Sequence, residues 1–267
     1  MLNQRRIVVV IPAFREEAHV AGVLATLPRY VDHAIVVDDG SDDRTGEEAR
    51  RAGRARDHLQ VQVLRHPVRR GVGAALVTGY RAALELTSAG DDAIAVMAGD
   101  GQMHPDDLEQ VVLPIVHARA DYIKGTRFGA PKVRRTMGLP RWLGGQVFSR
   151  LTSLAIGHPV TDSQCGFTAL SRRAAAALDL ADLWPSFGYP NDLLGQLAAR
   201  GARIAEVPVQ PIYGSEISKL RLRHLPPIFF LIGRAAVRRA HPAGVIQLGD
   251  IPQRQTRKLK AEPAVSS

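Results

Sequence analysis

Short apolar runs alternate with amphipathic stretches along the first half of the chain. Arg6–Ile11, Ala34–Val37 and Ala93–Ala98 are rich in β-branched or small apolar residues, and Gln60–Leu64 alternates apolar and polar side chains. Runs of this length predict strands, and the continuous ones are typical of strands buried on both faces. Because helical periodicity separates them, the pattern predicts a layered α/β fold with a mainly parallel sheet and right-handed crossovers.

The remaining elements follow from the same two periods. Helices are predicted at Glu16–Leu27, Asp43–Ala52, Arg69–Thr87, about 105–118, Arg141–Ile156, from Arg172 onward, and Asn191–Arg200. Strands are predicted at Tyr122–Thr126, Thr168–Leu170 and Arg203–Val209, and a basic surface loop at Ala130–Pro140. We therefore expect one domain over residues 1–218, a basic segment over 219–241 and a disordered polar tail over 242–267.

Composition narrows the classes of partner. With 35 Lys and Arg against 26 Asp and Glu, the 267-residue chain carries a formal charge of +9, which favours anionic partners. No nucleic-acid reader motif accompanies the charge, so nucleic acid is not expected. A single cysteine, Cys165, excludes an internal disulfide, and the sequence begins without a signal peptide. These features predict a cytoplasmic protein.

The basic segment has two interpretations. Lys219–Arg239 holds six Lys or Arg and no acid, around an apolar stretch far shorter than the ~20 residues that span a bilayer. It is either an amphipathic element on an anionic membrane surface, with Phe229, Phe230 and Ile232 inserted, or a helix that closes the core. The unbalanced charge favours the membrane, and hence a peripheral location on its inner face.

The strongest chemical signal is the turn after Ala93–Ala98. Asp100 and Gln102 follow this strand in a glycine-containing turn, and Pro105 opens the next helix. Open α/β sheets bind ligands at the carboxyl ends of their strands. A carboxylate and an amide oxygen suit Mg²⁺ or Mn²⁺ bound together with substrate phosphates. The alternative is an aspartate that only caps the helix.

Two earlier turns carry acids in equivalent places. Pro12 and Ala13 end the first strand before Glu16, and could offer backbone contacts to a nucleotide, although Glu16 could simply complement a helix dipole. Asp38 and Asp39 end the second strand. Asp39 could accept a hydrogen bond from a base N–H, or the pair could form an Asx turn.

The third strand leads to a glycine-rich turn, Arg69–Gly73, at a predicted helix start. Gly73 and its neighbours could present backbone N–H groups to an anion or nucleotide. The polar turns all follow parallel strands, so they are expected at one edge of one sheet.

Several motifs, in order, resemble family 2 glycosyltransferases. These are VVVIPAFREE, VVDDGSDD, GVGAA, MAGDGQMHPDDL, YIKGTRFG, TDSQCGFTALS and YPNDLL…GARIAEVPV, spanning about Arg6 to Ser218. The polyprenol-phosphate (dolichol-phosphate mannosyltransferase-like) branch is the most similar. The resemblance implies the GT-A fold, a nucleotide-sugar donor, a divalent metal and inversion at the anomeric carbon.

The resemblance also implies residue roles. It puts the nucleoside at Pro12, Ala13, Glu16 and Asp39, with Asp38 and Gly73 beside it. The metal motif of the family usually has two acids, separated by one residue. The first acid is replaced by Ala98 here, so Asp100 and Gln102 remain as the side-chain ligands.

Arg127 matches the acceptor-phosphate position, with Arg141 as a second candidate. A polyprenyl phosphate acceptor is already nucleophilic and needs no strong base. Asp192 stands where relatives with hydroxyl acceptors carry a base, so a soluble hydroxyl acceptor is the alternative. Because the first metal-motif acid is missing at Ala98, a non-catalytic nucleotide-binding protein is a further alternative.

Overall fold

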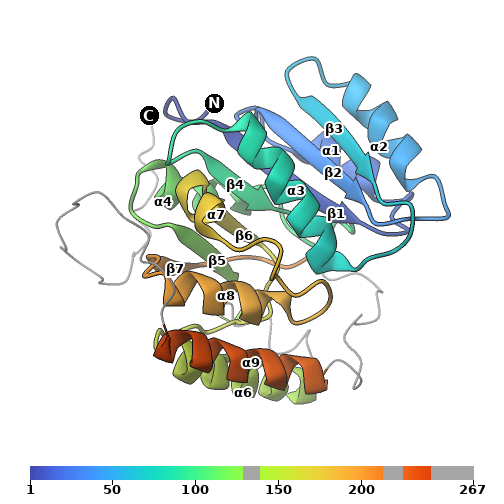
Figure 1. The fold of residues 1–267 in the computed structure, drawn as a ribbon. Coiled ribbons are helices and arrows are strands. Elements are labelled where there is room, and N and C mark those ends of the chain that lie inside the picture. Colours follow the sequence, from blue (N-terminus) through green and yellow to red (C-terminus); the bar gives the residue numbers. More distant parts are fainter. Residues whose placement is uncertain (129–138, 213–224, 242–267) are drawn as a thin grey trace.

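One mixed sheet forms the centre of the molecule (Figure 1). The structure, a computed structural model, describes residues 1–128, 139–212 and 225–241. The predicted basic loop up to residue 138, the boundary near residue 218 and the predicted tail over 242–267 lie outside these ranges. Within them the sheet has seven strands in the order β3-β2-β1-β4-β6-β5-β7.

The strands are β1 (Ile7–Ala13), β2 (His33–Asp38), β3 (Gln60–Arg65), β4 (Ala93–Val96), β5 (Tyr122–Thr126), β6 (Thr168–Ser171) and β7 (Ile204–Pro208). The pairs β1–β2, β1–β4, β2–β3 and β5–β7 are parallel, whereas β6 is antiparallel to both β4 and β5. The predicted α/β fold with a mainly parallel sheet is confirmed, and every predicted strand is present with ends within two residues. The reversed direction of β6 was not predicted.

Helices cover both faces of the sheet. They are α1 (Val20–Thr26), α2 (Thr45–Arg54), α3 (Val72–Leu86), α4 (Asp107–Val116), α6 (Leu139–Ile156), α7 (Arg172–Ala177), α8 (Tyr189–Ala199) and α9 (Leu225–Ala240). Buried residues of α1, α2 and α4 share one apolar core with the sheet, and those of α3, α6, α7, α8 and α9 share the other. Both faces of the strands are therefore buried, which explains their continuous apolar sequences.

The strand directions bring the polar turns to one edge. β1 to β5 all end at this edge, because the reversed β6 keeps β5 parallel in direction to β4. The segment that precedes β6, residues 162–167, begins at the same edge. The fold thus collects the turns after β1 to β5, the segment after β7 and one strand-start segment around a single rim.

The described part of the basic segment, from residue 225 onward, forms the helix α9, which packs on α6 and α8 (Figure 1). Ile228, Leu231 and Ile232 are buried in the core, so the prediction that Ile232 inserts into a membrane is wrong. Phe229 and Phe230 are 51% and 59% exposed. One face of α9 therefore closes the core, as the alternative interpretation held. In the described ranges, no helix combines the length and apolar character needed to cross a membrane.

Candidate active site

Backbone hydrogen bonds join the first, second and fourth strand-end turns. The carbonyl oxygen of Ala13 accepts from the N–H of Asp39 at 2.9 Å, and that of Pro12 accepts from the N–H of Gly99 at 3.1 Å. Pro12 and Ala13 thus lie between the Asp39 turn and the turn that carries Asp100. The predicted convergence of these turns at one edge is seen directly.

The carboxylate of Asp39 accepts hydrogen bonds from two backbone N–H groups and from one imidazole N–H group. Its Oδ1 accepts from the N–H of Arg70 and from Nδ1 of His66, and its Oδ2 accepts from the N–H of Gly71, each at 2.8 Å. The side chain is 5% exposed. These bonds draw the glycine-rich turn after β3 against the turn after β2. Gly40 permits the approach, since a Cβ there would lie 2.6 Å from the backbone N of Arg69.

Asp38 differs from its neighbour because it is fully buried. Its Oδ1 accepts from the N–H of Ser41 at 2.9 Å, and its Oδ2 lies 3.5 Å from Nε of Arg65. This is the local turn that the sequence left open as an alternative. In this conformation Asp38 stabilises the turn through its hydrogen bond with Ser41, and no part of it is exposed for contact with a nucleotide.

Glu16 is also buried, with its residue 6% exposed. Its backbone N–H donates to Oγ1 of Thr45 at 2.8 Å, and its Oε2 lies 3.0 Å from Nδ1 of His19. Glu16 therefore ties the turn after β1 to the start of α2. A direct nucleotide contact by its carboxylate stays a prediction.

Asp100 and Gln102 lie in a half-buried turn between β4 and α4. Oδ1 of Asp100 accepts from the N–H of Gln102 at 3.2 Å, and Gly101 between them has a φ of +73°, which suits glycine. The carbonyl of Gln102 accepts from the N–H of Ile212, so the turn is braced by the segment after β7. The turn brings a carboxylate and an amide to the site edge.

Arg127 is fixed by the buried Asp162. Its Nε and Nη2 donate to Oδ2 and Oδ1 of Asp162 at 2.7 and 2.9 Å, and its backbone N–H donates to Oδ2 at 3.2 Å. Burial opposes ionisation of Asp162, but the charge and hydrogen bonds of Arg127 outweigh it and lower the pKa of Asp162. The pair stays ionised, and the guanidinium has a defined orientation.

A small hollow of about 60 Å³ joins the two candidate groups. Gln102 and Met103 line it on one side, Arg127 and Cys165–Phe167 on another, and Val209–Pro211 close it. The metal candidate and the acceptor-phosphate candidate therefore share one depression at the rim, although they are 25 positions apart in sequence.

Gly73 has a packing role. A Cβ at this position would lie 2.0 Å from the carbonyl oxygen of Trp184, so only glycine permits this approach. The next N–H, that of Ala74, donates to the carbonyl of Pro185 at 3.0 Å. The N-terminus of α3 is thus covered by protein at Ala74, which is a different role from the predicted ligand contact at Gly73.

Asp192 does not have the surroundings of a base. It is fully buried at the start of α8 and accepts from the N–H of Trp184, from Nε and Nη2 of Arg234 and from Nη1 of Arg238. Two guanidinium groups compensate its charge, so it joins α8, α9 and the loop at Trp184. These contacts give Asp192 a structural role, and its catalytic role stays a prediction. For Arg141, in α6, the structure describes the backbone only.

Two residues of this region were not singled out from sequence. Lys124 in β5 is fully buried, and its Nζ donates to the carbonyl of Cys165 at 2.6 Å beneath the hollow. Burial lowers the pKa of Lys124. A lysine in an otherwise apolar strand was the available signal. His66, the partner of Asp39, resembled any other polar residue at a strand end.

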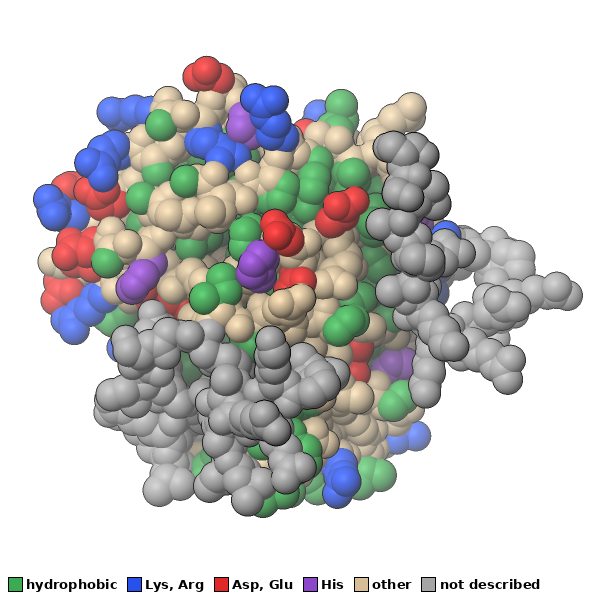
Figure 2. All heavy atoms as spheres, turned by 180° about the vertical axis from the view of Figure 1, so that it is seen from behind, with side chains coloured by type: hydrophobic (Ala, Val, Ile, Leu, Met, Phe, Trp, Pro, Cys, Tyr) green, Lys and Arg blue, Asp and Glu red, His purple; other side chains and the backbone are tan. Residues whose placement is uncertain are grey.

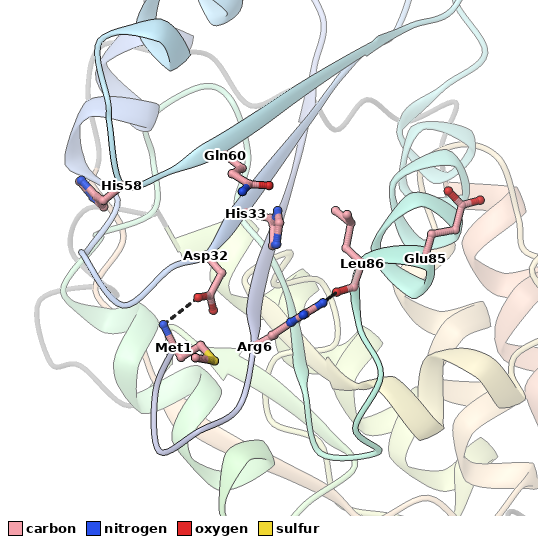
Figure 3. A pocket seen from close by; sticks show the side chains of 8 residues that line it. All are labelled: Met1, Arg6, Asp32, His33, His58, Gln60, Glu85 and Leu86. Atoms are coloured by element: carbon pink, nitrogen blue, oxygen red, sulfur yellow. Dashed lines mark hydrogen bonds and ion pairs between the residues drawn. The ribbon is translucent and has the colours of Figure 1, made fainter.

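A second hollow, of about 480 Å³, lies at the opposite edge of the sheet (Figure 3). Arg6, Asp32, His33 and Gln60 line it at the amino ends of β1, β2 and β3. Asp32 and the terminal amine of Met1, which also lines the hollow, form a salt bridge at 2.8 Å. The hollow is separated from the candidate site by the length of the strands.

Comparison with known proteins identifies the family. The sequence pattern described as "Glycosyl transferase family 2" matches residues 8–178, which include the turns after β1 to β5. The chain belongs to glycosyl transferase family 2.

Named relatives of this family 2 glycosyltransferase act on polyprenyl phosphates. A UDP-N-acetylglucosamine–dolichyl-phosphate N-acetylglucosaminyltransferase of Methanococcus voltae is 32% identical over 79% of this chain and 88% of its own length. An undecaprenyl-phosphate mannosyltransferase of Micrococcus luteus is 28% identical over 76% of this chain and 82% of its own. The resemblance to the polyprenol-phosphate branch is thereby confirmed.

Solved structures confirm the GT-A fold. Glucosyl-3-phosphoglycerate synthase of Mycobacterium tuberculosis aligns with a TM-score of 0.64 at 23% identity, over 88% of this chain and 81% of that one. At this identity the likeness concerns the fold.

Proposed function

We propose that this glycosyltransferase is a metal-dependent inverting enzyme that moves a sugar from a nucleotide-sugar to polyprenyl phosphate at the cytoplasmic membrane face. The observation that supports the proposal is the hollow shared by Gln102 and Arg127, the residues that we propose as metal ligand and phosphate ligand. The relatives named for dolichyl and undecaprenyl phosphate support this class of acceptor.

The side chains at the β4–α4 turn fit a divalent cation that keeps other ligands. In the described residues no group of three or more His, Cys, Asp or Glu side chains forms a metal cage. Asp100 and Gln102 offer one carboxylate and one amide oxygen, and Mg²⁺ is typically bound by one or two carboxylates together with water and substrate phosphates. Structures of the mycobacterial synthase are titled as complexes with UDP and Mg²⁺ or Mn²⁺. When bound, the metal would neutralise the diphosphate leaving group.

Arg127 would hold the acceptor. A guanidinium fixed in orientation by Asp162 suits binding of a phosphate oxyanion. In the reaction, an acceptor phosphate oxygen forms a bond to the anomeric carbon while the bond to the donor diphosphate breaks. The nucleoside diphosphate leaves with the electron pair, and attack from the opposite side inverts the configuration. Because the acceptor oxygen is already anionic, no protein base is needed.

Two alternatives are a soluble hydroxyl acceptor and a non-catalytic nucleotide-binding protein. A soluble hydroxyl acceptor would need a base, and Asp192, the residue matched to that role, is engaged by Arg234 and Arg238. A non-catalytic nucleotide-binding protein was suggested by Ala98, but one carboxylate and one amide are a sufficient set for a metal that also binds phosphates. We therefore favour the polyprenyl phosphate acceptor.

The helices α6 and α9 offer a surface for the membrane. Six of their large apolar side chains are 49–74% exposed: Leu143, Val147, Leu154, Phe229, Phe230 and Val237. The two helices pack side by side at one end of the molecule (Figure 1). Arg234 and Arg238 are paired with Asp182 and Asp192, so we propose apolar contact, rather than the charge of these two residues, as the attraction to lipid.

A lipid surface is the occupant that we propose for this exposed face, because an acceptor with a polyprenyl chain resides in a bilayer. On the coloured part of the face in Figure 2, basic and acidic side chains are intermixed.

A transfer assay tests the reaction. Purified full-length protein is given UDP- and GDP-sugars with Mn²⁺ or Mg²⁺, with and without a short polyprenyl phosphate. Release of nucleoside diphosphate that depends on the lipid is expected. Transfer to a soluble hydroxyl acceptor with no response to the lipid would overturn the proposed acceptor.

Vesicle sedimentation tests the membrane face. The double variant Phe229→Gln and Phe230→Gln is expected to reduce binding to vesicles of anionic and neutral phospholipid about tenfold or more, since two aromatic side chains lose apolar contact. Val68→Gln, at a side chain 66% exposed in the loop after β3, is the matched control. Equal binding by the double variant and the control would exclude this face.

A further inference from the structure

The carboxylate of Asp39 has a restricted capacity for a ligand. An ionised carboxylate accepts about four hydrogen bonds, two on each oxygen. Oδ1 already accepts two, from Arg70 N–H and His66 Nδ1, while Oδ2 accepts one, from Gly71 N–H. One acceptor direction therefore remains, and it belongs to Oδ2.

His66 is the side chain that fills Oδ1. Because an ionised carboxylate only accepts, Nδ1 of His66 must be the donor. The imidazole is 6% exposed, and its Nε2 lies 2.9 Å from Oγ1 of Thr78 in α3. The backbone N–H of His66 also donates to the carbonyl of Asp38 at 2.9 Å. The ring is held at both ends and cannot turn away from Asp39 without losing a buried hydrogen bond.

The nucleobases differ in the donors that they present to such a carboxylate. Guanine offers two adjacent donors, its ring N–H and its amino group, which pair with the two oxygens of one carboxylate. Uracil offers one ring N–H. Cytosine offers an amino donor beside a bare ring nitrogen, whose lone pair would face the carboxylate. A buried donor without an acceptor is costly, so the number of open acceptor directions selects the base.

We propose that His66 is a specificity-determining residue, which by occupying Oδ1 of Asp39 restricts the site to a single-donor base and makes the donor a uridine diphosphate sugar. This inference rests on the proposed nucleotide-sugar function, and specifically on Asp39 as the base contact. It goes beyond that function, in which uridine and guanosine donors stand equal.

A binding panel on the unaltered protein tests the inference without a variant. Affinities of UDP, GDP and CDP are measured by calorimetry with Mn²⁺ present. We expect UDP to bind about tenfold or more tightly than GDP and CDP. GDP or CDP binding as tightly as UDP would overturn the inference and leave the transferase proposal standing. Failure of all three to bind would overturn the nucleotide-sugar proposal itself, and the inference with it.

Substitutions at position 66 separate specificity from structure. His66→Ala removes the donor to Oδ1, so the ratio of UDP to GDP affinity should fall several-fold as the second acceptor opens. His66→Asn is the matched control, because its amide N–H can replace Nδ1 and should keep the ratio near that of the unaltered protein.

A purely structural role for His66 would weaken UDP and GDP binding alike. An unchanged ratio in a folded His66→Ala protein would therefore overturn the role of His66, even if the unaltered protein prefers UDP. Thermal unfolding of each variant confirms that the binding comparison is made on folded protein.

Discussion

Two sets of aspartates in this molecule are held by different donors. Asp39 and Asp100 accept from backbone N–H groups, with one imidazole at Asp39. Asp121, Asp162 and Asp192 accept from arginine side chains. Backbone N–H groups satisfy a carboxylate without cancelling its charge, whereas a guanidinium does both. Asp39 thus keeps its negative charge for a base, and the arginine-held acids connect parts of the fold.

This difference separates acids that the sequence alone treats alike. Asp100 and Asp192 both stand near helix starts in matched motifs, yet only Asp100 is half-exposed at the site edge. The pair of Asp162 and Arg127 combines features of both groups of acids. Asp162 is buried and held by an arginine, whereas Arg127 lines the hollow. An arginine-held acid can therefore serve the site indirectly, by orienting the arginine.

Removal of the Asp100 carboxylate should give the largest loss of activity. We expect Asp100→Ala to lower the rate of sugar transfer about a hundredfold or more, because the leaving diphosphate loses the charge compensation that a metal supplies. The free energy of unfolding should change less than the transfer rate, since the side chain lies in a half-buried turn rather than in the core.

Asp106→Ala is the control for Asp100→Ala. Its side chain is 85% exposed in the same connection between β4 and α4. Both rates are measured with Mn²⁺ varied over a wide range. Equal transfer by the two variants at every Mn²⁺ concentration would remove Asp100 from the metal site.

Asp192→Asn should affect stability more than chemistry. The substitution leaves the Arg234 and Arg238 guanidinium groups without their buried partner, and breaking a buried pair of this kind costs about 3–5 kcal/mol. Urea unfolding measures the loss, and transfer is assayed at a temperature where the variant is folded. A stable variant that has lost transfer would support Asp192 as a base and would place it among the acids of the site.

Arg127→Lys should alter the response to the acceptor. Lysine keeps the positive charge beside Asp162 but lacks the two-pronged geometry that a guanidinium offers to a phosphate. We expect the KM for polyprenyl phosphate to rise about tenfold while the KM for the nucleotide-sugar is unchanged. A rise in the donor KM alone would move Arg127 to the donor side of the site.

The local sequence was sufficient to predict the strands and the turns that follow them. β-branched runs such as Ile7–Ala13 are buried on both faces, and parallel strands bring their ends together whatever lies between. This is why Asp39, Asp100 and Gln102 could be predicted at one edge.

The donors to each carboxylate could not be predicted in this way. Arg234 and Arg238 lie 42 and 46 positions after Asp192, and His66 lies 27 positions after Asp39. No short motif records such pairs. The same holds for the charge of α9, which looked unbalanced because its acidic partners come from α8 and the loop before it.

Acid titration of stability gives the smallest effect and the most direct test of the arginine-held group. Burial opposes ionisation of Asp121, but hydrogen bonds from Arg203 and Arg173 outweigh it and lower the pKa of Asp121 below its ordinary value. A lowered pKa in the folded state stabilises the protein above the unfolded-state value of about 3.9. That contribution is lost as the pH falls through the folded-state pKa, and it amounts to about 1.4 kcal/mol for each unit of the shift.

The stability difference between the unaltered protein and Asp121→Asn should therefore be constant at neutral pH and shrink below about pH 4. Urea unfolding midpoints at several pH values between 7 and 3 measure it, and acids common to both proteins cancel in the difference. Asp106→Asn is the control, because its exposed side chain should give no such trend. A difference for Asp121→Asn that is independent of pH would mean that the arginines do not hold this carboxylate ionised, and the distinction between the two groups of acids would fail at its simplest case.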